Sequence, residues 1–135
     1  GAAALRGQID RLLRREEGWV LVDFKYAGGA HSAEELLDNY GFQLKTYALA
    51  AERLLREPLR SVQIHVLNRA ESHALSFRPE ELAAHAELLE TLAAQWAAGG
   101  ADLEAVGLRP ACLSCPYHRD LSLCPVPKGR PFRAA

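Results

Sequence analysis

The sequence lacks an excess of charge of either sign, a long apolar run and internal repeats. Sixteen basic residues stand against seventeen acidic ones, which gives a formal net charge of -1 over 135 residues. Free-standing nucleic-acid binders usually carry a basic excess, so any such binding must be local or supplied by a neighbouring domain. No apolar run approaches the length of a membrane span, and no secretory segment opens the chain. These absences exclude a membrane partner and predict a soluble, cytoplasmic protein.

Cysteine is scarce and methionine is absent. Three cysteines, an odd number, argue against a disulfide framework and leave metal binding or free thiols. The chain opens on Gly1 without an initiator methionine, so we expect a fragment of a larger protein. Its length fits one domain that buries about two-thirds of the unfolded surface. We expect a core over residues 1–100 and a cysteine-containing tail over residues 101–135.

The apolar pattern predicts an α/β fold with the element order ββαββα. Alternating or continuous apolar runs indicate strands, and apolar positions three and four apart indicate helices. The expected elements are strands at 5–15 and 19–27, a helix at 32–57, strands at 61–69 and 73–77, and a helix from 79 to about 99. Ser32 and Glu35 form a capping-box pattern, and Pro79 suits a first helical residue.

Two charged residues end a strand that is otherwise apolar, in the run WVLVDFKYA. Asp23 and Lys25 are two apart, so they share one face of the strand. If Glu17 and Gly18 form the hairpin turn, Lys25 lies opposite Asp10 and Asp23 is the diagonal neighbour of Asp10. A slip of one residue would turn Asp10 to the other face.

Two carboxylates and one ammonium on a half-buried surface need compensation, because like charges repel when desolvated. A divalent cation is the natural solution. Mg²⁺ takes one or two carboxylates, keeps several waters and accepts phosphate oxygens, which suits hydrolysis of a phosphodiester. Gln43 and Tyr47 are four apart on one face of the expected helix, from which they can reach the sheet as substrate or water positioners.

Three motifs together carry a resemblance to a known family. GQID at 7–10, VDFK at 22–25 and YGFQLKTYA at 40–48 resemble, in order and interval, the ID, DxK and QxxxY motifs of RecB-like nuclease domains of the PD-(D/E)XK superfamily, as in the C-terminal domain of AddAB/RecB-type helicase-nucleases. The resemblance covers most of residues 5–78. It implies a restriction-endonuclease-like core, with a mixed four-stranded sheet flanked by helices.

The resemblance also implies an activity and a site. The activity is that of a DNA exonuclease that depends on Mg²⁺ or Mn²⁺. The implied metal ligands are Asp10, Asp23 and the backbone carbonyl of Phe24, with Lys25 in the catalytic role and Gln43 and Tyr47 near the substrate. Similar proteins often add a histidine ligand from a helix before the first strand, and we expect that helix upstream of this fragment.

The tail contains Cys112-x2-Cys115-x8-Cys124. A CxxC loop lets two thiolates hold one metal, and a third cysteine before a proline fits a cluster site. In similar RecB-like nucleases, three such cysteines and a fourth upstream hold a [4Fe-4S] cluster. We expect this cluster in the parent protein and an absent or incomplete one in the fragment. One alternative is a Zn²⁺ site with His118 as the fourth ligand. The other is that the three cysteines are reduced thiols that bind no metal.

The isolated residues also have simpler interpretations. Asp10 can be a surface charge beside Arg11, and Asp23 with Lys25 can be an ion pair at a strand end. Tyr40 and Tyr47 can be packing aromatics. The remaining histidines are interpreted as surface or edge residues, although His65 could approach the sheet face; they are His31, His65, His73 and His85.

Three functional hypotheses follow from the resemblance and the site residues. The first is the nuclease domain of a helicase-nuclease in double-strand-break repair and recombination, where a helicase domain or partner subunit feeds it single-stranded DNA. The second is a stand-alone single-strand exonuclease of the CRISPR-adaptation kind. The third is a catalytically inactive copy that only binds DNA or a partner.

Overall fold

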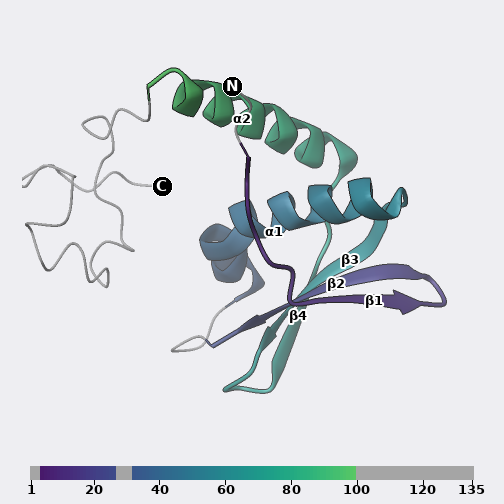
Figure 1. The fold of residues 1–135 in the computed structure, drawn as a ribbon. Helices are drawn as coiled ribbons and strands as arrows, with labels where there is room; N and C mark the ends of the chain where they lie inside the picture. Colours follow the sequence, from purple (N-terminus) through teal and green to yellow (C-terminus); the bar gives the residue numbers. More distant parts are fainter. Residues whose placement is uncertain (1–3, 27–31, 100–135) are drawn as a thin grey trace, which may run out of the picture. The chain divides into compact units, whose positions relative to one another are not determined.

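The computed structural model of the chain describes residues 4–26 and 32–99. The predicted order ββαββα is confirmed (Figure 1). The elements are β1 (Arg11–Arg15), β2 (Gly18–Lys25), α1 (Ala33–Leu55), β3 (Leu59–Val66), β4 (Glu71–Leu75) and α2 (Pro79–Ala97). The described residues up to Ala94 form one compact unit.

The sheet is mixed and has four strands in the order β1-β2-β3-β4. β1 and β2 are antiparallel, β2 and β3 parallel, and β3 and β4 antiparallel. Parallel neighbours need a long crossover connection, and here α1 supplies it. β2 is therefore an interior strand, as its apolar run predicted, and α1 lies against one face of the sheet (Figure 1).

The β1–β2 hairpin differs from the prediction in its turn. The loop consists of Glu16 and Glu17, because Arg15 pairs with Gly18. Gly18 has a φ of +129°, a conformation that side-chain-bearing residues rarely adopt. The glycine is thus required at the first position of β2, just after the turn, and the turn sits one residue earlier than expected. β1 also begins at Arg11, well after residue 5.

Local sequence signals set the ends of α1. Ser32 accepts a hydrogen bond from the Glu35 backbone N–H and donates its own backbone N–H to the Glu35 carboxylate, so the capping box is confirmed. The helix ends at Leu55, and Arg56 adopts a left-handed conformation with a φ of 57°. Its backbone N–H donates to the Glu52 carbonyl, which satisfies one of the last carbonyls of the helix.

The second hairpin is shifted by about two residues toward the N-terminus. β3 covers Leu59–Val66 where 61–69 was expected, and β4 covers Glu71–Leu75 where 73–77 was expected. Ala70 has a φ of 53° in the connecting turn, so residues 67–70 turn the chain and cannot continue the strand. Pro79 begins α2, as predicted.

The core lies between α1 and the sheet. Leu21 of β2, Ile64 of β3 and Leu44 of α1 are fully buried members of one apolar cluster. Because strand side chains alternate, Asp23 and Lys25 lie on the same face of β2 as Leu21. This face looks toward α1, and that is where the charged residues meet the helix. No helix in the described ranges is long and apolar enough to cross a membrane.

Candidate active site

Asp23 is a buried carboxylate on an interior strand, with only 2% of its surface exposed. Its register partner on the neighbouring strand β3 is Ile64, and on the other side β1 begins with Arg11 opposite Val22, one position before Asp23. The Lys25 Nζ lies 2.6 Å from the Asp23 Oδ2. That oxygen is nevertheless without a hydrogen bond, because the ammonium is close but poorly aligned. Among the described residues, the Asp23 Oδ2 therefore has a charge partner in Lys25 but no hydrogen-bond donor.

Lys25 joins β2 to α1. Its Nζ donates to the Gln43 Oε1 over 3.0 Å and lies 4.7 Å from the centre of the Tyr40 ring, a cation–π distance. With Asp23 this gives the ammonium three partners from two elements. Such a lysine is held in one place, and its charge is directed at the end of β2.

Gln43 and Tyr47 continue the chain of contacts along α1. The Gln43 Nε2 donates to the Tyr47 hydroxyl over 3.1 Å. Lysine can only donate, so the Gln43 oxygen must face Lys25 and its amide nitrogen must face Tyr47. The Tyr47 oxygen then accepts, and its own proton remains available for a further acceptor such as a phosphate oxygen.

Asp10 lies one residue before β1 and is exposed. Its Oδ2 accepts a hydrogen bond from the Phe24 backbone N–H over 2.8 Å. The expected pairing of Asp10 with Lys25 is wrong, because Arg11 pairs with Val22 and the next position places Asp10 opposite Asp23. The error in register is two residues, an even number, so Asp10 stays on the predicted face. The structure thus brings Asp10 to the backbone between Asp23 and Lys25.

The charges and acceptor atoms of these residues suit a cation site. Asp10, Asp23 and Lys25 sum to one negative charge, and the buried Asp23 oxygen without a hydrogen bond can accept a metal ion. In residues 4–26 and 32–99 no group of three or more His, Cys, Asp or Glu side chains gathers. Mg²⁺ needs only one or two carboxylates, so the set fits this ion and does not fit a structural Zn²⁺ site.

Tyr40 is a site residue that the sequence interpretation treated as a packing aromatic. It is half-buried, packs against the core cluster and carries the Lys25 ammonium over its ring. Tyr40, Gln43 and Tyr47 are three and four apart, so they form one continuous stripe on α1. That spacing was the signal from which its role could have been found.

Among the described histidines, His85 takes a different place from the one expected. His85 is buried, with 6% of its surface exposed, so its interpretation as a surface residue is wrong. It contacts the Phe42 ring edge to face and lies 2.9 Å from the Thr46 Oγ1. His65 reaches the sheet face opposite α1, where it contacts Phe24, and is therefore remote from the Asp23 face. His31, His118 and the three cysteines lie outside the described residues.

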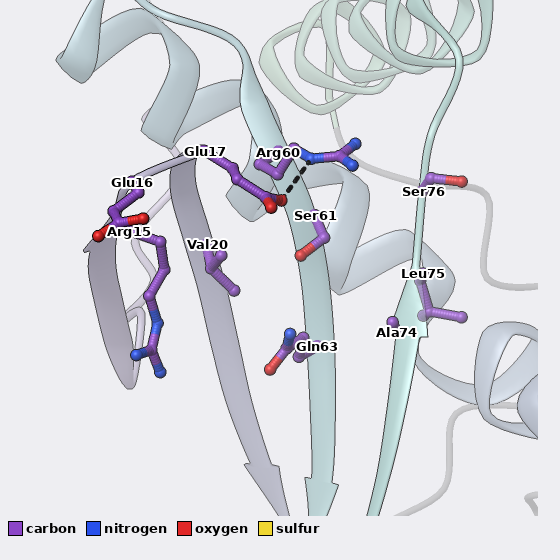
Figure 2. A pocket seen from close by; sticks show the side chains of 10 residues that line it. All are labelled: Arg15, Glu16, Glu17, Val20, Arg60, Ser61, Gln63, Ala74, Leu75 and Ser76. Carbon is purple, nitrogen blue, oxygen red and sulfur yellow. Dashed lines mark ion pairs between the residues drawn. The ribbon is translucent and has the colours of Figure 1, made fainter.

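A hollow of 710 Å³ lies on the sheet face opposite α1 (Figure 2). Val20, Ser61 and Gln63 line it, beside an ion pair between Arg60 and Glu17 at 3.5 Å. Its walls are mixed in charge, and none of the five predicted catalytic side chains lines it. This hollow is therefore separate from the five predicted catalytic side chains.

A mixed α/β sheet that carries a buried aspartate and a lysine two residues apart, close to a second aspartate, offers the carboxylate oxygens with which a divalent cation can be held beside a phosphate. The comparison with protein families agrees. Residues 1–125 match the PD-(D/E)XK nuclease superfamily, and the chain belongs to that superfamily. The predicted restriction-endonuclease-like α/β fold is confirmed. Comparisons with curated proteins and with solved structures give no match.

We expect Gly7→Ala to lower activity through Tyr47. A Cβ at Gly7 would lie 2.8 Å from the Tyr47 Cε1, so the ring must move and the hydrogen bond from Gln43 must change. Misplacement of a positioning group by about 1 Å can cost as much as 10²-fold, and we expect a loss of about tenfold to a hundredfold in DNA cleavage. In a Tyr47→Phe background the same substitution should add little. Independent, additive losses would contradict this role of Gly7.

We expect the stability of the protein to fall below about pH 6.5 because of His85. Burial lowers the pKa of His85 from its ordinary value of 6.5, and Lys45 acts in the same direction, against a hydrogen bond to the Phe42 carbonyl. Well above pH 6.5 the His85 ring is neutral in both the folded and the unfolded chain. As the pH falls below 6.5, the unfolded chain takes up the proton first and is stabilised relative to the folded chain. Thermal melts at several pH values should show a smaller acid loss in His85→Gln. An equal loss in both proteins would refute the assignment.

Proposed function

We propose that this chain is a RecB-like nuclease domain that hydrolyses DNA phosphodiester bonds, acts as an exonuclease on single-stranded DNA and depends on Mg²⁺ or Mn²⁺. The observation that supports this most directly is the continuous contact chain from Asp23 through Lys25 and Gln43 to Tyr47. Nucleases of the PD-(D/E)XK superfamily generally use divalent metal ions, and a nuclease domain implies DNA binding.

The proposed roles follow from the contacts. Asp10, Asp23 and the Phe24 carbonyl would hold the metal ion, which when bound would lower the pKa of a water and neutralise phosphate charge. Lys25 is positioned to orient the attacking water and to offset charge on the phosphate. Gln43 fixes Lys25 by accepting a hydrogen bond from its ammonium, and the Tyr47 hydroxyl can donate a hydrogen bond to a phosphate oxygen.

The proposal also covers the wider context. We place the domain in the cytoplasm, in a helicase-nuclease of double-strand-break repair and recombination. A helicase domain or partner subunit supplies single-stranded DNA and much of the phosphate affinity that a net charge of -1 does not provide. Cys112, Cys115 and Cys124 supply three thiolates to a [4Fe-4S] cluster whose fourth ligand lies elsewhere in the parent protein.

The decisive experiment is a metal titration of cleavage. End-labelled single-stranded DNA should be degraded by the purified chain with Mg²⁺ or Mn²⁺ and remain intact with EDTA. Asp10→Asn should raise the Mg²⁺ concentration needed for half-maximal activity, whereas Asp38→Asn, an exposed aspartate of α1, should not. DNA binding without cleavage at any metal concentration would overturn the proposed nuclease activity and support the hypothesis of a catalytically inactive domain.

A further inference from the structure

A groove of 650 Å³ lies between α1, α2 and residues 5–9. In Figure 1 the segment that leads into β1 crosses α1 on its way to the sheet. Gly7 in this segment is close enough to Tyr47 that no side chain fits between them. We call this hollow the α1–α2 groove; its volume lies within the range of about 300–1,000 Å³ that is typical of small-molecule pockets.

The α1–α2 groove is continuous with the candidate active site. Gln43 and Tyr47, the last two members of the contact chain that starts at Asp23, are also part of its wall. A ligand at this end of the groove would touch Gln43 and Tyr47, the groups that would face the substrate phosphate. A phosphate bound at the site would place its neighbouring nucleotide at the mouth of the groove.

The walls combine apolar, aromatic and basic groups. Phe42 lines the groove and is 53% exposed, although its ring is held edge to face by His85. Arg6 and Arg53 also line it, and neither forms an ion pair within the described part of the chain. Glu90 is the one acidic residue on these walls, so the groove carries a positive balance. Aromatic surfaces beside unpaired cations are what single-stranded nucleic acids bind.

We propose that the α1–α2 groove binds the nucleotide next to the scissile phosphate of a single-stranded DNA substrate. The base lies among the apolar and aromatic side chains, and Arg6 and Arg53 hold the adjacent backbone phosphates. This inference rests on the proposed nuclease function and names the part of its substrate that the groove takes. An apolar segment of a partner protein is the competing occupant; it accounts for the apolar walls but not for the two unpaired arginines.

The first test measures the charge contribution in EDTA, where no cleavage occurs. Fluorescence anisotropy with a labelled oligodeoxythymidine should show weaker binding by Arg53→Gln and a salt slope that is smaller by about 0.7, the value for one phosphate contact on a single strand. Arg56→Gln is the matched control, because Arg56 is exposed, lies one turn away and does not line the groove. Equal losses in both variants would mean diffuse attraction only and would overturn the proposal.

The second test fills the groove. Ala50 is an exposed residue on its wall, so Ala50→Phe occupies the space without disturbing the core. The wild type should bind oligodeoxythymidine about fivefold or more tightly than an abasic oligonucleotide of equal length, which is the contribution of one stacked base. Ala50→Phe should lose this preference. Ala84→Phe, at an exposed position of α2 outside the groove, should keep it.

The outcomes separate this inference from the nuclease function. If the wild type cleaves DNA but Ala50→Phe keeps the base preference, the groove has another occupant, such as an apolar segment of a partner, and the inference fails alone. If the wild type shows the base preference but never cleaves, the enzyme function fails while the groove assignment stands. Loss of the base preference in Ala50→Phe, with unchanged thermal stability, supports the proposal.

Discussion

Asp23→Asn should abolish DNA cleavage, with a fall of about 10³-fold or more. The substitution keeps the size of the side chain but removes the buried negative charge that would bind a divalent cation. Stabilisation of transition-state charge by a metal ion contributes several kcal/mol, and about 4 kcal/mol corresponds to a factor of 10³ in rate. The measurement is the single-turnover cleavage rate of end-labelled single-stranded DNA at saturating Mg²⁺.

The controls for Asp23→Asn separate chemistry from folding and binding. Circular dichroism should be unchanged, because the variant side chain has the same size and the hydrogen bond from Lys25 to Gln43 remains. Anisotropy in EDTA should show that DNA binding is retained. Asp38→Asn, which removes one charge from the outside of α1, should cleave normally. A rate within tenfold of the wild type would rule out Asp23 as a metal ligand.

Lys25→Met should lower cleavage by about 10²-fold to 10³-fold, the cost of removing one charge-stabilising donor. Methionine has a similar length but carries no charge, so the ammonium is lost from Asp23, Gln43 and the Tyr40 ring together. Asp23 is then left buried without a counter-charge. Removing one partner of a buried ion pair costs about 3–5 kcal/mol, and we expect a loss of stability up to that size in urea.

Added Mg²⁺ distinguishes a metal site from a simple ion pair in this variant. If Asp10 and Asp23 bind the ion, Mg²⁺ should raise the melting temperature of Lys25→Met more than that of the wild type, because the ion replaces the missing positive charge. Lys45→Met, on the same helix as Gln43 but paired with the Phe77 ring, serves as a control and should show no such gain. Equal shifts in all three proteins would contradict a cation site at Asp23.

Much of the local structure could be predicted from sequence because its causes are local. Ser32 and Glu35 are three residues apart and satisfy each other at the start of α1. Pro79 begins α2 for another local reason, because its fixed φ and missing N–H suit the first turn of a helix. Gln43 and Tyr47 are four apart on a helix, so their contact followed from helical geometry alone.

The register of the first hairpin could not be predicted from the sequence, and the predicted register differs from the observed one by two residues. Glu17-Gly18 and Glu16-Glu17 are both two-residue loops, and the choice depends on where Gly18 uses its positive φ. The prediction placed the glycine inside the turn, whereas the structure uses it at the start of β2. The shift of two residues preserved the face of Asp10 only because side chains alternate with a period of two.

The sequence by itself determined that Asp23 and Lys25 share one face of a strand, because they are two residues apart. It also determined that Gln43 and Tyr47 share one face of a helix, because they are four apart. Only the tertiary structure decided that Lys25 meets Gln43 across eighteen positions of the chain, and that His85 is buried against Phe42. Those contacts depend on how the α1 crossover packs on the sheet and how α2 packs on α1. Packing of this kind is a property of the whole core, because it is set by long-range burial and not by the preferences of neighbouring residues.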